Sequence, residues 1–201
     1  MCFNLSKRTK VIFIVVVLLI LLAGGFFYYW QNREIKGSPD DYVITETEQG
    51  KIVENEKAGF SVEVPKGWTP EKMKVEEGVI SINSQDAEFE KKDNQIVLPL
   101  QKGCVINIEI IYRELTIDQL KDEVKYTHFL MGKIFDEFEE IDIDDFLALK
   151  NNFNTESSGE TLAIYIPKEN KIYSFFLFWG PNNEEFCTQA FNEFLEKISI
   201  K

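Results

Sequence analysis

The sequence predicts an α+β fold, with a mainly antiparallel sheet covered by helices on both faces and one N-terminal transmembrane helix. Val11–Trp30 is apolar throughout. Several later segments alternate apolar and polar residues with the two-residue period of β-strands. Residues 116–131 and 184–198 instead repeat apolar residues at the spacing of an amphipathic helix, and they are the expected covers of the sheet.

Val11–Trp30 contains neither a charged residue nor a proline, and it is 20 residues long. A helix of that length measures about 30 Å, the thickness of the hydrocarbon core of a bilayer. The segment ends in five aromatic residues at 26–30, which suit a membrane–water interface better than a signal-peptidase site. The segment therefore predicts an uncleaved signal anchor, which we favour over a cleaved signal peptide or a buried core helix.

Basic residues around the anchor predict its orientation. Lys7, Arg8 and Lys10 precede it, whereas only Arg33 and Lys36 follow it closely, and this bias favours a cytosolic N-terminus. The expected protein is a single-pass protein of the cell membrane with its C-terminal domain outside. The predicted organisation is a cytosolic tail (1–10), a transmembrane signal anchor (11–30), a linker (31–50) and an extracytoplasmic domain (51–201).

The charge of the chain limits its partners. The formal net charge is −12, and the first 30 residues hold three basic residues and no acidic ones, so the remainder is more acidic still. A strongly acidic surface disfavours nucleic acid and anionic lipid headgroups, because both require a basic surface. Apart from the membrane reached by Val11–Trp30, the composition favours basic partners or cations.

The first half of the domain reads as a series of strands. Phe60–Val64 alternates as a half-buried strand and is ended by Pro65-Lys66-Gly67. A short strand is expected at Val79–Ile82, and residues 86–102 read as a loop or small hairpin. Part of Tyr42–Thr45 is a candidate edge strand. Residues 103–113 predict a strand with one apolar face, formed by Cys104, Ile106, Ile108 and Ile110.

The second half adds two helices and a meander. Thr116 and Gln119 have the spacing of a capping box at the start of the first helix. Strands follow at residues 138–143 or 146–154, at 161–166 and at 171–179, the last two joined by a four-residue turn at 167–170. Tyr173–Trp179 is apolar on both faces and is expected at the centre of the sheet. The terminal helix has an apolar stripe made of Phe186, Cys187, Ala190, Phe191, Phe194, Leu195 and Ile198.

The segment Gly59–Trp68, with the sequence GFSVEVPKGW, resembles the opening strand of PsbP-like domains. The later order of a strand, a capped helix, a meander and a Phe-rich terminal helix is also similar. The resemblance covers about Lys51–Lys201 and implies an α/β/α sandwich of the membrane-anchored bacterial type. It also implies binding or assembly work, because no catalytic residue is shared across that superfamily.

An acidic segment carries the candidate metal ligands. Residues 136–145 contain seven carboxylates, and on a strand Glu140, Asp142 and Asp144 would point outward together about 7 Å apart. Three carboxylates on one face are a candidate site for weakly bound Ca²⁺. The segment lacks the glycine and glutamate that an EF-hand loop needs at its sixth and twelfth positions. A solvated strand without a metal is the favoured interpretation.

Cys104 and Cys187 are both expected to point into the core, from a strand and from the terminal helix. Outside the cytosol a disulfide between them would persist, but two buried free cysteines are equally compatible with the pattern. His128 is the chain's only histidine, which excludes a histidine-rich metal site within one chain. It is expected on a helix surface or at the edge of the core.

These features favour a membrane-anchored extracytoplasmic binding or assembly module without catalytic activity, whose partner is another envelope protein. No cofactor is expected beyond the weakly bound Ca²⁺ considered above. A small-ligand or cation-binding sensor is the alternative, and a carboxylate-based hydrolase is the third possibility.

Overall fold

The chain divides into two units, Met1–Glu34 and Ile35–Lys201. The computed structural model describes residues 13, 16–25, 35–48, 50–73, 78–92, 95–130, 134–135, 137–143, 145–155 and 159–201. In the first unit, residues 16–25 are helical and exposed. No helix within the described ranges is long and apolar enough to cross a membrane. Residues 11, 12, 14, 15 and 26–30 lie outside those ranges, so the anchor at Val11–Trp30 stays a prediction.

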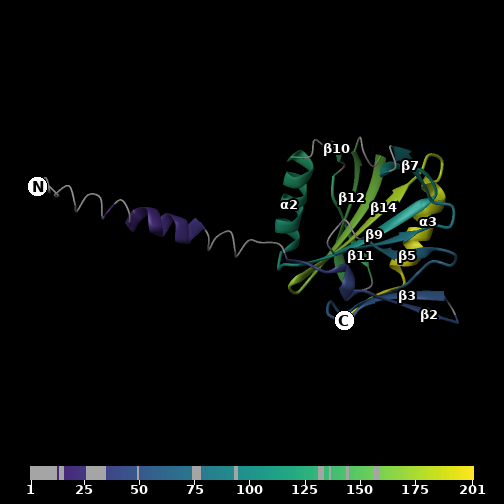
Figure 1. The fold of residues 1–201 in the computed structure, drawn as a ribbon, viewed down its shortest axis with the longest axis horizontal. Helices are drawn as coiled ribbons and strands as arrows, with labels where there is room; N and C mark the ends of the chain where they lie inside the picture. Colours follow the sequence, from purple (N-terminus) through teal and green to yellow (C-terminus); the bar gives the residue numbers. More distant parts are fainter. Residues whose placement is uncertain are drawn as a thin grey trace, which may run out of the picture. The chain divides into compact units, whose positions relative to one another are not determined.

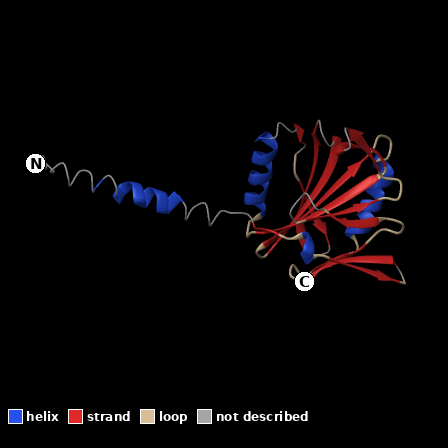
Figure 2. Cartoon of the chain, viewed as in Figure 1, coloured by secondary structure: helices blue, strands red, loops and turns tan. Residues whose placement is uncertain are grey.

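The second unit is built on a large antiparallel sheet, and β14 lies at its centre between β13 and β9 (Figures 1 and 2). This confirms the predicted central position of Tyr173–Trp179. β1 pairs with β9, and β11 pairs with β12. In spatial order the strands are β10 (Ile134–Phe135), β12 (Phe146–Thr155), β13 (Gly159–Lys168), β14 (Lys171–Trp179), β9 (Cys104–Tyr112), β6 (Val79–Asn83) and β5 (Thr69–Lys72), with β1 (Ile35–Lys36) and β11 (Glu139–Ile143) beside them.

Each face of this sheet has its own apolar core, because successive side chains of a strand point to opposite faces. In β13, Ile164 joins the core under helix α3 (Glu184–Leu195), whereas Tyr165 joins the core under helix α2 (Ile117–Leu130). The two helices lie on opposite sides of the sheet in Figure 1. The predicted α+β fold with an antiparallel sheet is therefore confirmed for the folded unit.

A smaller sheet and a hairpin complete the unit. The small sheet has the order β15 (Ile198–Ile200), β4 (Phe60–Glu63), β3 (Gly50–Asn55) and β2 (Val43–Thr47). The predicted strand at Phe60–Val64 is confirmed, and β2 occupies the edge position expected for part of Tyr42–Thr45. Strands β7 (Glu88–Lys92) and β8 (Gln95–Lys102) form the hairpin that was one of the two readings of residues 86–102.

Helix α2 starts with the capping box that its sequence predicts. The Gln119 backbone N–H donates to Thr116 Oγ1 at 3.3 Å, and the Thr116 backbone N–H donates to Gln119 Oε1 at 2.9 Å. These two bonds satisfy donors that would otherwise lack partners at the start of the helix. Leu120 and Val124 then pack against the sheet.

Three boundaries differ from the sequence prediction. Helix α3 ends at Leu195 rather than Ile198, because residues 198–200 pair with β4 and close the small sheet. The turn between β13 and β14 has two residues rather than four, because Lys168 already pairs with Lys171. Phe186 is 57% exposed and does not belong to the apolar stripe, since the buried side of α3 is formed by Cys187, Phe191 and Phe194.

The structure also differs from the predicted linker at residues 31–50. From Ile35 onward this segment belongs to the folded unit, and it includes a short 3₁₀ helix, η1 (Pro39–Asp41). The Gly37 N–H donates to the Ile110 carbonyl at 3.0 Å, and the fully buried Tyr42 donates its hydroxyl proton to the Gly78 carbonyl at 3.3 Å. One buried tyrosine thus fixes a segment whose composition is otherwise typical of a linker. Residues 31–34 and 49 lie outside the described ranges.

Candidate functional site

Two adjoining hollows lie beside the first turn of α3. One has a volume of about 400 Å³ and lies between α3 and strands β12 and β13. The other has a volume of about 520 Å³ and follows the turn after β14. Glu160, Trp179 and Glu184 line both hollows, so we treat them as one feature, the Trp179 groove. The remaining lining residues that the argument uses are Asn152, Asn154, Leu162, Glu185 and Thr188.

Trp179 is the last residue of β14 and lies partly exposed between the two hollows. It is on the same face of the strand as Phe175 and Leu177, and it packs against the core under α3. One part of the indole is therefore held by the core, while the rest lines the groove. This combination gives a rigid aromatic surface that a partner can contact without ordering the side chain first.

Three carboxylates surround Trp179. Glu160 comes from β13, and Glu184 and Glu185 come from the first turn of α3, where the helix dipole stabilises negative charge. All three are exposed, and none forms an ion pair with any residue that the structure describes. Lys150 also lines the groove, but its Nζ lies 3.0 Å from a carboxylate oxygen of Glu139. The groove therefore keeps a local excess of negative charge.

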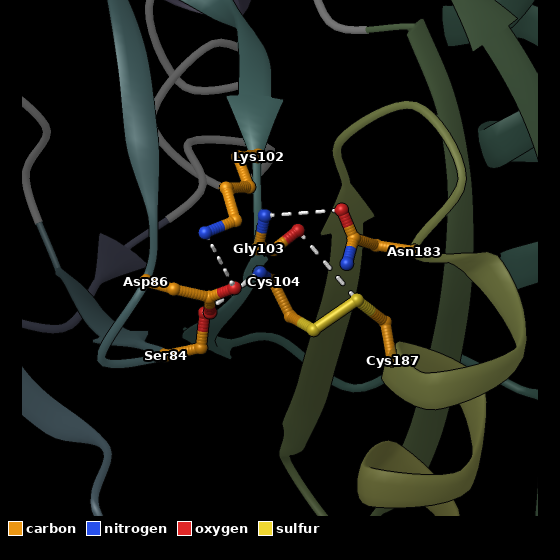
Figure 3. The surroundings of a disulfide bond; sticks show 7 residues. All are labelled: Ser84, Asp86, Lys102, Gly103, Cys104, Asn183 and Cys187. Atoms are coloured by element: carbon orange, nitrogen blue, oxygen red, sulfur yellow. Dashed lines mark hydrogen bonds and ion pairs between the residues drawn. A yellow bond between two sulfur atoms is a disulfide. The ribbon is translucent and has the colours of Figure 1, made fainter.

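A disulfide between Cys104 and Cys187 lies next to the groove and holds α3 against the sheet (Figure 3). Cys104 is the first residue of β9 and pairs in register with Trp179, and Cys187 lies in the first turn of α3. Both cysteines are fully buried, and their Cα atoms are 5.6 Å apart. The disulfide thus links the strand beneath Trp179 directly to the helix that carries Glu184 and Glu185.

Hydrogen bonds around Gly103 reinforce this link (Figure 3). The Gly103 N–H donates to Asn183 Oδ1 at 3.3 Å, and its carbonyl accepts from the Gly180 N–H at 2.9 Å. The Cys104 N–H donates to Ser84 Oγ at 2.9 Å, and the Ser84 hydroxyl donates to Asp86 at 2.9 Å. The turn that forms one end of the groove is therefore fixed to the start of β9 by backbone and side-chain contacts.

Gly180 occupies a position where no larger residue fits. A Cβ atom added there would lie 2.6 Å from the Cα atom of Lys102, closer than real contacts allow. Gly180 begins the turn between Trp179 and α3, so the close approach of two backbone segments sets the shape of this end of the groove.

The acidic strand does not assemble a metal site among the residues that the structure describes. No group of three or more His, Cys, Asp or Glu residues is arranged there to hold a metal. Glu140 and Asp142 are exposed on β11 and Ile143 is buried, as the alternation predicts, but Asp144 lies outside the described ranges. Glu140 accepts a hydrogen bond from Lys121, and this bond raises the pKa of the lysine ammonium. An ion pair thus occupies one of the proposed Ca²⁺ ligands.

His128 lies on α2 and is buried, with only 2% of its surface exposed. Its ring centroid lies 4.6 Å from that of Phe153 on β12. The histidine is therefore part of the packing between α2 and the sheet rather than a helix-surface residue, and it lies on the face opposite α3.

Sequence reasoning missed the Trp179 groove. Its lining comes from β12, β13, β14 and α3, so no local motif marks it. Two signals in the sequence point toward it in retrospect. Trp179 is the last apolar residue before Gly180-Pro181, and a strand that ends at such a turn leaves its last side chain near the edge of the core.

Comparisons with known proteins place the fold but not the activity. No protein-family model and no curated protein matches the chain. Among solved structures it resembles PsbP (CyanoP) from Synechocystis sp. PCC 6803, at 13% identity and a TM-score of 0.50, covering 80% of this chain and 93% of that one. A protein of Bacteroides thetaiotaomicron gives 12% identity and a TM-score of 0.45, covering 85% of this chain and 49% of that one. LpqN of Mycobacterium tuberculosis, described as involved in cell envelope biogenesis, gives 12% and 0.47, covering 87% and 95%.

Proposed function

Since the chain has the PsbP-like fold, we propose that it is a non-catalytic binding module of the cell envelope that engages another envelope protein through the Trp179 groove. The observation that carries this proposal is the groove itself. It combines an aromatic anchor with polar and acidic side chains, and a disulfide fixes the helix on which two of the carboxylates lie. Aromatic anchors fixed in advance are typical of the residues that contribute most to protein–protein binding.

The groove suits a protein partner better than a small substrate. It is an open hollow at the surface, whereas sites for small molecules enclose most of the ligand's surface. Its carboxylates come from separate elements and face solvent, which gives none of them the apolar surroundings that prepare a carboxyl group for acid–base chemistry. These properties support a role in binding.

Two further features support a place outside the cytosol. A disulfide such as that between Cys104 and Cys187 persists in oxidising compartments. The apolar segment Val11–Trp30 has the length and aromatic end of a membrane anchor. In the proposed arrangement the segment tethers the folded unit to the outer side of the cell membrane, within reach of other envelope proteins.

Replacing Trp179 by leucine tests the proposal. Leucine keeps an apolar side chain against the core but removes the indole from the groove. We expect partner recovery in crosslinking pulldowns of the full chain from native membranes to fall at least tenfold, because loss of a tryptophan anchor costs about 2 kcal/mol or more. Tyr126→Ala is the matched control, since Tyr126 is an exposed aromatic residue on α2, on the other face of the sheet.

The control variant should recover the partner as well as the unaltered chain does. Equal recovery by Trp179→Leu and the unaltered chain, with both folded by circular dichroism, would contradict binding through the groove. If no reproducible partner were found while the purified chain turned over a substrate, the non-catalytic role would be wrong as well.

A further inference from the structure

We propose that the Trp179 groove takes a basic, extended segment of the partner protein, a step that rests on the function proposed above and names the chemistry of the partner. The segment carries lysine or arginine side chains at alternate positions. Three properties of the groove point to this occupant: its charge, its aromatic surface and the spacing of its amide side chains.

The charge of the groove selects for cations. Glu160, Glu184 and Glu185 face the same hollow beyond the turn of β14, and no described residue neutralises them. At an effective dielectric constant near 20, one cation about 4 Å from a carboxylate gains roughly 4 kcal/mol before desolvation is subtracted. The same charges repel phosphate and carboxylate groups, which disfavours nucleic acid, anionic lipid headgroups and acidic peptides as occupants.

Trp179 adds a surface that recognises cations attached to apolar stems. A lysine ammonium or an arginine guanidinium over the face of an indole is attracted by the negative face of the ring. The methylene groups of these side chains can lie along apolar surface while the charged end reaches a carboxylate. Leu162 supplies such a surface beside Trp179, and Glu184 lies where the charged end of the side chain would be needed.

The floor of the groove fits an extended main chain. Asn152 and Asn154 are exposed, lie two residues apart on β12 and both line the hollow. Alternate residues on one face of a strand are about 7 Å apart, and the main-chain groups of an extended peptide repeat at the same interval. Each asparagine amide offers both a donor and an acceptor, so the pair can bind successive peptide groups without reading the side chains between them.

Binding of short synthetic peptides tests this inference. The probe is an eight-residue peptide alternating lysine and glycine, and the matched control peptide alternates glutamate and glycine. The full chain, kept in a non-ionic detergent, is labelled at its tryptophan indole nitrogens and followed by NMR. We expect the lysine peptide to shift the indole signal of Trp179, assigned through the Trp179→Leu variant, while the glutamate peptide leaves it unchanged.

Two triple variants separate the groove from the general acidity of the chain. Glu160→Gln/Glu184→Gln/Glu185→Gln removes the three groove carboxylates, and we expect it to weaken lysine-peptide binding at least tenfold. Glu46→Gln/Glu54→Gln/Glu71→Gln removes three exposed carboxylates outside the groove lining and should weaken it less than twofold. Equal weakening by both triple variants, or no shift at Trp179, would overturn the inference.

The native partner distinguishes failure of this inference from failure of the proposed function. If Trp179→Leu loses the partner in membrane pulldowns but the groove Glu→Gln triple variant retains it fully, the groove binds a partner that is not basic. The basic segment is then wrong and the proposed function stands. If neither variant loses the partner, the proposed function itself fails.

Discussion

Replacing both Cys104 and Cys187 by alanine should lower the free energy of unfolding by about 4.5 kcal/mol in the chain-entropy model of disulfide stabilisation. The large value follows from the 83-residue separation of the two cysteines, because a longer closed loop restricts the unfolded chain more. Urea unfolding of the full chain, followed by far-UV circular dichroism, measures the difference between the variant and the unaltered chain.

Cys2→Ala is the matched control, because Cys2 lies far from both core cysteines in the sequence and its loss should change the free energy of unfolding by less than about 0.5 kcal/mol. Unfolding in the presence of dithiothreitol should reproduce the double-alanine result for the unaltered chain. A loss below about 1 kcal/mol in the double variant would contradict a disulfide that closes this loop.

Phe191→Ala is expected to lower the free energy of unfolding by about 4 kcal/mol, within the range for removal of a fully buried phenylalanine. Phe191 has no exposed surface, and its ring stacks on Phe194 at a centroid distance of 6.0 Å. Phe194 in turn meets Phe175 of β14 edge to face, also at 6.0 Å. Removal of the Phe191 ring therefore leaves a cavity at the contact between α3 and the sheet. Urea denaturation again provides the measurement.

Phe186→Ala on the same helix supplies the comparison. Phe186 is 57% exposed, so its truncation should change the free energy of unfolding by no more than about 0.5 kcal/mol. The sequence assigns Phe186 and Phe191 to one apolar stripe, whereas the structure places only Phe191 in the core. Similar losses for the two variants would contradict the observed orientation of α3.

The sheet was the most predictable part of the fold. The strand at residues 103–113 alternates so regularly that Cys104, Ile106, Ile108 and Ile110 could be assigned to one face, and all four are fully buried. Tyr173–Trp179 is apolar on both faces because both faces of β14 are covered. Where burial follows the period of the backbone, the sequence carries enough information to place a strand and orient it.

Other elements depended on contacts that the local sequence does not contain. Residues 198–200 continue a helical pattern, but they pair with β4, more than 130 residues earlier in the chain. The segment before β2 has the polar composition of a linker, and only the burial of Tyr42 shows that it belongs to the folded unit. Tertiary contacts override local preference in both cases.

The candidate site was less predictable than the fold. The cysteines could be placed in the core, but sequence alone left open whether they are joined, since that depends on the distance between β9 and α3. The groove carboxylates gave no signal either, because Glu160 and Glu184 are 24 residues apart and only the turn at Gly180 brings β13, β14 and α3 together at Trp179. The acidic cluster at residues 136–145 was the conspicuous feature of the sequence, yet Glu140 is paired with Lys121.

Photo-crosslinking from the floor of the groove tests binding at Trp179 most directly. A photoreactive phenylalanine analogue at Asn152, which is exposed in the groove, should give a discrete crosslinked partner in native membranes. The same analogue at Glu71, which is exposed on β5 at the other edge of the main sheet, should give at least tenfold less of that product, since partner contacts concentrate where the anchor lies. Equal yields from the two positions, or a product from Glu71 alone, would contradict the groove as the binding site.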